Sequence, residues 1–154
     1  ATYSHNYFID YYVYFNDNKN KVSLKDNDIA GFPSFMSNFG INYINDNLYV
    51  GLTGKYVGEF YTDNYGELLQ TNEVIINDLK ADWLGYYADN TVDAYLVFDL
   101  DASYTFTNVA FLKSLKLQTQ VNNLFNKLYA YSGEAREFFP AAERSIFVGV
   151  EFGL

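Results

Sequence analysis

Most residues that could support chemistry are carboxylates, and they concentrate between residues 62 and 93. This stretch holds seven acidic residues against Lys80 alone, a net charge of −6 out of −9 for the whole chain. Several carboxylates on one loop can supply oxygen ligands to a cation or to a cationic group. The spacing does not match a calcium-binding EF-hand loop, so we expect a solvated acidic loop. Asp63 and Asp82 are its candidate ligand-binding residues.

The same stretch contains an aromatic group, Trp83, Tyr86 and Tyr87. Such rings can form a stacking platform for a ring or a sugar. We favour an aromatic girdle or a packed loop over such a platform. We retain all three as candidate ligand-binding residues.

Residues for catalysis are scarce. Asp99 and Asp101 lie two positions apart, which suits an acid–base pair. On a barrel strand the same two residues would instead be polar groups, hydrogen-bonded to Lys or Arg of the next strand, and we favour this second interpretation. The chain has no cysteine and one histidine, His5. This excludes thiolate metal sites and cysteine nucleophiles and makes a Ser-His-Asp triad improbable. We predict no catalytic residue, no metal site, no cofactor and no enzymatic activity.

Composition limits the class of protein. The 154 residues suffice for one domain; 49% are hydrophobic and 19% charged, which excludes a disordered tail. The net charge of −9 argues against nucleic acid as a partner. No run of about 18 apolar residues predicts a transmembrane helix.

Alternation of apolar and polar residues, the signature of β-strands, recurs along the chain. In one example Leu96, Phe98 and Leu100 share a face opposite Asp99 and Asp101. Tilted membrane-spanning strands need about 9–11 residues, and the predicted strands are at least this long. Six are predicted, at 2–14, 34–45, 48–61, 94–106, 113–125 and 145–154.

The predicted connections differ in length. Those around residue 46 and at 107–112 are short, whereas 15–33, 62–93 and 126–141 are long. Short turns on one rim and long loops on the other are typical of an antiparallel transmembrane β-barrel in the outer membrane. The long loops would be extracellular and the C-terminus periplasmic. The alternative is a small secreted or surface β-sandwich, whose strands alternate in the same way.

Several motifs resemble one family, in the right order and over nearly the whole chain. Residues 121–129 (VNNLFNKLY), residues 137–144 (EFFPAAER) and the final strand resemble the C-terminal signature of TonB-dependent outer-membrane receptors. Residues 55–64 and 95–106 resemble two earlier strands of that family, and residues 31–33 (GFP) resemble the re-entry into the strand before them.

The resemblance implies that residues 1–154 are the C-terminal part of a larger barrel of about 22 strands, of which these are the last six. It implies an N-terminal plug domain, which we do not find in this chain. The implied function is energised uptake of a scarce ligand such as a siderophore, cobalamin, metal or glycan. The implied partners are outer-membrane lipid, the small ligand, and the TonB–ExbB–ExbD complex acting through the plug.

Overall fold

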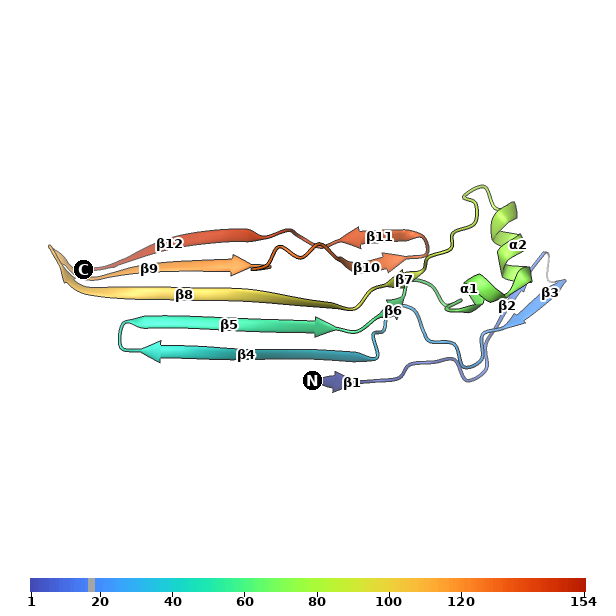
Figure 1. Ribbon diagram of the computed structural model, residues 1–154, viewed down its shortest axis with the longest axis horizontal. Helices are drawn as coiled ribbons and strands as arrows, with labels where there is room; N and C mark the ends of the chain where they lie inside the picture. Colours follow the sequence, from blue (N-terminus) through green and yellow to red (C-terminus); the bar gives the residue numbers. More distant parts are fainter. Residues whose placement is uncertain (17–18) are drawn as a thin grey trace.

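The computed structural model describes residues 1–16 and 19–154. Its main feature is one antiparallel sheet of six strands in the order β1-β4-β5-β8-β9-β12 (Figure 1). Five of the strands are long enough to cross a bilayer when tilted. Their bounds are Phe35–Asn45 (β4), Leu48–Val57 (β5), Tyr95–Val109 (β8), Leu112–Asn122 (β9) and Ser145–Gly153 (β12), and β1 is Thr2–Tyr3.

The strand register places mostly apolar residues opposite one another on one side of the sheet. Since directly opposed residues of antiparallel strands lie on the same face, each row of partners defines a face. One such row is Ile41, Leu52, Leu100, Val121 and Ile146. We call this side of the sheet the apolar face. The alternation in the sequence predicted this face correctly.

The opposite side, the polar face, carries hydroxyl, amide, glycine and charged residues. A representative row is Tyr49, Ser103, Gln118 and Gly149, and on β4 it ends at the apolar Ile44. A shift of one residue in any pairing would mix the two faces, so the register is strongly specified.

The connections divide between the two ends of the sheet (Figure 1). At one end β4 joins β5 at Asp46–Asn47, and β8 joins β9 at Ala110–Phe111. At the other end lie the long connections 4–34, 58–94 and 123–144, which together we call the cap. The expected alternation of short and long connections is therefore present.

The cap has secondary structure of its own. Three two-stranded sheets form it: β2 with β3, β6 with β7, and β10 with β11. The helices α1 (Leu68–Thr71) and α2 (Glu73–Ala81) lie in the second connection. The strand bounds are Tyr12–Phe15 (β2), Asn20–Ser23 (β3), Phe60–Tyr61 (β6), Thr91–Val92 (β7), Ala130–Glu134 (β10) and Glu137–Pro140 (β11).

The predicted strand 2–14 is wrong in its extent. Only Thr2 and Tyr3 pair with β4, and the chain then leaves the sheet. Tyr12–Phe15 pairs instead with Asn20–Ser23 inside the cap. The alternation was real, but it does not continue the apolar face: Val13 and Phe15 pack in the cap core, whereas Ile9 is exposed. The 15–33 connection includes residues 17 and 18, which lie outside the described residues.

The predicted strand 48–61 is divided in two. β5 ends at Val57, and the amide of Gly58 donates a hydrogen bond to the Phe35 carbonyl (2.8 Å). A Cβ at position 58 would lie 3.1 Å from that oxygen, so glycine permits the close approach. The remaining Phe60–Tyr61 pairs with β7 in the cap.

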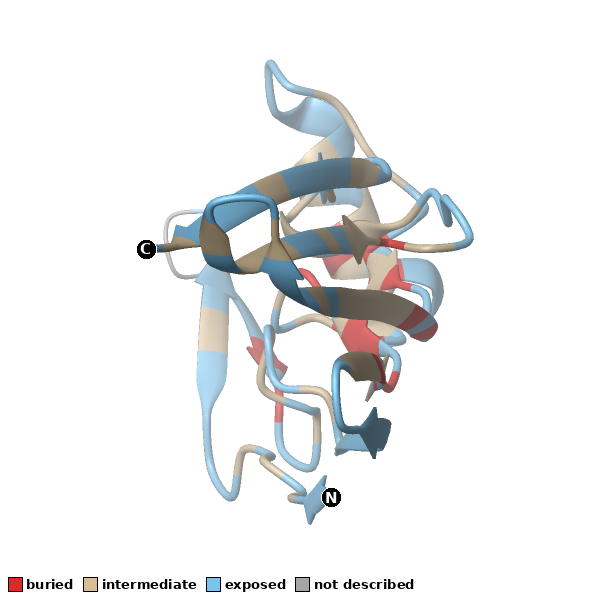
Figure 2. Ribbon diagram, turned by 90° about the vertical axis from the view of Figure 1, so that its left-hand side faces the viewer, coloured by how far each residue is buried: buried red, intermediate tan, exposed pale blue. Residues whose placement is uncertain are grey.

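Burial is concentrated in the cap and in the sheet next to it. The buried hydrophobic residues form two clusters, one within the cap and one around Val57, Phe60, Val92, Tyr95 and Val97. Elsewhere the sheet is exposed or half-buried except at Gly51 and Gly54, and most of its strands are pale blue or tan in Figure 2. In the described residues no second sheet covers the apolar face, as a β-sandwich would require. Neither α1 nor α2 has the length and apolarity to cross a membrane.

Candidate ligand-binding cap

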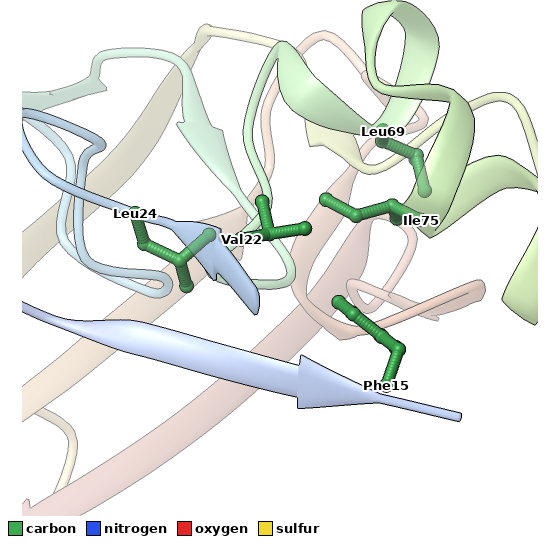
Figure 3. Close-up of a cluster of buried hydrophobic side chains, with 5 residues drawn as sticks. All are labelled: Phe15, Val22, Leu24, Leu69 and Ile75. Atoms are coloured by element: carbon green, nitrogen blue, oxygen red, sulfur yellow. The ribbon is translucent and has the colours of Figure 1, made fainter. Parts of the chain in front are cut away.

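The cap is held together by a small hydrophobic core drawn from two connections. Phe15, Val22 and Leu24 come from the first, and Leu69 and Ile75 come from the second (Figure 3). Leu24, Leu69 and Ile75 have no exposed surface. Burying a side chain of this size contributes about 1.5–3 kcal/mol. These segments are therefore one packed unit and not separate solvated loops.

The helices that supply Leu69 and Ile75 were not predicted from the sequence. α2 begins after Asn72, whose side chain accepts hydrogen bonds from the amides of Val74 (3.0 Å) and Ile75 (3.3 Å). This is an N-cap, and it satisfies amides that have no partner within the helix. The apolar residues that follow Asn72 with helical spacing were the available signal.

Asp63 is the centre of a hydrogen-bond network inside the second connection. Its Oδ1 accepts from the amide of Tyr65 (2.7 Å) and from Nδ2 of Asn90 (3.0 Å). Its Oδ2 accepts from the Tyr87 hydroxyl (3.0 Å). Asn90, which is 1% exposed, also donates to the Gly66 carbonyl. The carboxylate thus ties both ends of this connection together, a role that the sequence did not reveal.

The two tyrosines beside Asp63 are protonated well beyond neutral pH. Burial, and then the neighbouring Asp63 carboxylate, raises the pKa of Tyr87 above the usual phenol value. Burial, followed by the charges of Asp63 and Asp78, raises the pKa of Tyr65. Both effects disfavour a phenolate in a low-dielectric, negatively charged environment. Tyr87 therefore stays a hydrogen-bond donor to Asp63.

The third connection docks onto the second through polar contacts. Ala135 donates its amide to the Thr62 carbonyl (3.0 Å), and the Thr62 hydroxyl donates to the Ala135 carbonyl (2.5 Å). The Arg136 guanidinium donates to the Leu84 carbonyl. The first connection reaches the same place, since the Gly31 amide donates to the Tyr61 carbonyl (2.9 Å). All three connections therefore meet around Thr62 and Asp63.

A hollow of about 440 Å³ opens where they meet. Of the sequence candidates, Asp63, Asp82 and Tyr87 line it. Trp83 lies outside it and is 90% exposed, while the Tyr86 hydroxyl donates to the Leu69 carbonyl (3.2 Å). The structure thus brings three of the five candidates together and leaves two apart.

The sequence did not predict the residues that line this hollow from the first and third connections. Tyr11 belongs to the first, and Glu134 and Arg136 belong to the third. Arg136 lies 73 residues from Asp63 in sequence, and no local pattern joins them. The only available signal was that each of the three connections is long.

A second hollow, of about 490 Å³, lies on the polar face of the sheet. Asp101, Lys116, Gln118 and Phe147 are among its lining residues. Asp99, on the same face, accepts a hydrogen bond from the Asn123 amide (2.8 Å), where we had expected a Lys or Arg partner. Across the described residues no group of three or more His, Cys, Asp or Glu side chains is arranged to hold a metal ion.

The asparagine-rich motif at 121–129 has a structural role. Asn123 is buried, has a φ of +52°, and directly follows β9. Its side chain donates to the carbonyls of Lys127 (2.9 Å) and Ala142 (3.2 Å) and accepts from the Lys127 amide (2.8 Å). Asn126 accepts from the Arg144 amide (2.8 Å), just before β12 begins. These amides hold the return into the last strand in place.

Comparison with known proteins agrees with this architecture. Residues 1–124 match the family model described as TonB dependent receptor-like, beta-barrel. The chain therefore belongs to this family of TonB-dependent receptors, which are transport receptors of the outer membrane. The family resemblance and the membrane-barrel strands predicted from the sequence are confirmed. No curated protein matches the chain in sequence.

Solved structures show the same fold at low sequence identity. The siderophore receptor PiuA from Acinetobacter baumannii aligns over 89% of this chain with a TM-score of 0.61 and 21% identity. The unliganded ferric citrate transporter FecA aligns over 82% with a TM-score of 0.58 and 15% identity. The ferric-catecholate import receptor Fiu from E. coli K12 aligns over 84% with a TM-score of 0.54 and 18% identity. The chain spans only 16–17% of the length of these three structures.

Proposed function

We propose that residues 1–154 are the C-terminal part of a plugged outer-membrane barrel that imports a scarce small ligand in a TonB-dependent manner. The single observation that carries this proposal is the two-faced register of the sheet. One side presents rows such as Ile41–Leu52–Leu100, and the other presents hydroxyl, amide and charged groups. A transmembrane barrel requires this arrangement, because its outer face contacts lipid and its inner face contacts water.

The remainder of the barrel and the plug would belong to parts of the protein outside this chain. The small share of each similar structure that the chain covers supports this proposal. So does the sheet itself, because open edges in lipid leave backbone groups without partners. TonB, with ExbB and ExbD, would act through the plug. A chelated metal is the cargo class that the names of the similar structures support.

The orientation that we propose places the cap outside the cell and the tight turns, with the C-terminus, in the periplasm. Short turns are periplasmic and long loops extracellular in outer-membrane barrels. Residues 1–154 have no cysteine, so a single cysteine placed here in an otherwise cysteine-free full-length protein reports on orientation directly. In intact cells a membrane-impermeant maleimide should label Trp83→Cys but should label Asp46→Cys only after lysis. Labelling of Asp46→Cys in intact cells would refute this orientation.

The native polypeptide and its transport activity test the rest of the proposal. Intact mass, measured on protein extracted from membranes in detergent, should be several-fold above 17.7 kDa. Cells that express the full-length protein should take up ferric chelates in a way that ceases when TonB is deleted. A native mass near 17.7 kDa would instead support the small β-protein alternative.

A further inference from the structure

The cap carries almost all of the negative charge of the chain. Its three connections contain fifteen acidic and seven basic residues, a net charge of −8 out of −9. Within residues 1–16 and 19–154 the one ion pair is between His5 and Asp28, at 3.2 Å. The lysines and arginines of the described chain therefore leave its carboxylates without ion-pair partners. A set of unpaired charges of one sign produces a field that attracts ligands of the opposite sign.

The hollow between the three connections has the lining of a small-molecule site. Tyr11, Tyr65 and Tyr87 contribute aromatic surface, and Val13 and Leu84 contribute aliphatic surface. Ligand sites combine a mostly apolar concave wall with a few polar groups that fix orientation. The volume of about 440 Å³ accommodates a single aromatic ring with a short side chain.

The polar groups of this hollow are predominantly acidic. Asp63, Asp82 and Glu134 line it together with one cation, Arg136. Asp63 is already bound to Tyr65, Tyr87 and Asn90 within the cap. Asp82 and Glu134 are exposed, and Arg136 donates to the Leu84 carbonyl. Two carboxylates thus remain available to a ligand.

We propose that this hollow binds a cationic small molecule with an aromatic or apolar body, and that the cap disfavours anionic ligands. The inference rests on the proposed function in that the hollow would be the outer ligand site of the receptor. A protonated amine would lie against Asp82 and Glu134 while its ring contacts the tyrosines. A ligand of net negative charge would meet like charge across the whole cap.

Three probes with one ring and different charges test the proposal: tyramine, a cation; 4-hydroxyphenylethanol, neutral; and 4-hydroxyphenylacetate, an anion. Binding to the purified full-length protein in detergent is measured by saturation-transfer NMR at low salt. Tyramine should bind at least about tenfold more tightly than 4-hydroxyphenylacetate, with the neutral probe between them. The difference should shrink in high salt, because salt screens exposed charges.

The double variant Asp82→Asn/Glu134→Gln should lower the ratio of the affinities for tyramine and for 4-hydroxyphenylacetate. The expected decrease is about two- to fivefold for each carboxylate removed, which is the range for exposed charge pairs. The matched control is Glu67→Gln/Glu73→Gln, which removes the same charge from the same cap but does not line the hollow. The control should leave the preference nearly unchanged. An equal loss in both variants would overturn the site.

Equal or tighter binding of the anion would overturn the proposal, as would failure of all three probes to bind at millimolar concentration. These results are distinguishable from failure of the proposed function, which is measured separately as TonB-dependent uptake. A receptor that imports in a TonB-dependent manner but prefers the anion refutes the ligand inference alone. Preference for tyramine without TonB-dependent uptake refutes transport alone.

Discussion

Truncating a buried side chain in the cap should loosen the cap and leave the sheet intact. Ile75 has no exposed surface and packs in the core with Leu69, Phe15 and Val22. Ile→Ala at a fully buried site costs about 2–5 kcal/mol through lost transfer free energy and the cavity left behind. The sheet is stabilised separately by its own strand pairing and by the second cluster around Val57.

The assay is amide hydrogen exchange of the full-length protein, which reports the free energy of local opening. A loss of about 2.7 kcal/mol raises the exchange rate of α2 amides about 100-fold. Exchange in β4, β5 and β8 should stay the same. The matched control is Ile9→Ala, the same truncation in the same cap at a residue that is 78% exposed.

The reasoning would be refuted if Ile75→Ala and Ile9→Ala changed exchange equally. It would also be refuted if the sheet amides accelerated as much as those of α2. The first result would mean that the cap has no core, and the second that cap and sheet unfold as one unit.

Three further predictions address the sheet and the Asp63 network. Leu100→Arg, on the apolar face, should cost about 2–4 kcal/mol when the full-length barrel is refolded into lipid, whereas Ser103→Arg on the polar face should cost much less. Asp63→Asn replaces an acceptor oxygen of the carboxylate with an amide donor, so it should destabilise the cap by about 1–3 kcal/mol, measured by limited proteolysis between residues 62 and 93. Because the pKa of Tyr87 is raised in the folded cap, the unfolded chain releases this proton first as pH rises. Cap stability should therefore be fully present below pH of about 10 and fall above it, and Tyr87→Phe should flatten that fall in hydrogen exchange measured against pH.

The chain sequence determined the sheet because strand alternation is a local property. Leu96, Phe98 and Leu100 mark the apolar face whatever surrounds them, and the register then follows from matching apolar rows. The tight connection at Asp46–Asn47 was readable for the same reason, since its residues tolerate a positive φ. The family motifs at 121–144 likewise lie within one short stretch.

Only the tertiary structure decided the cap. The alternation at 2–14 looked like another strand of the sheet, yet residues 12–15 pair within the cap, because the apolar side of this segment is buried by Leu69 and Ile75 from sixty residues away. The sequence identifies Asp63 as a charged residue. Its hydrogen-bond partners Tyr87 and Asn90 are brought to it only by the folding of the second connection. The hollow combines Tyr11, Asp82 and Arg136 from three connections. Sequence spacing carries no information on such contacts; packing between distant segments creates them.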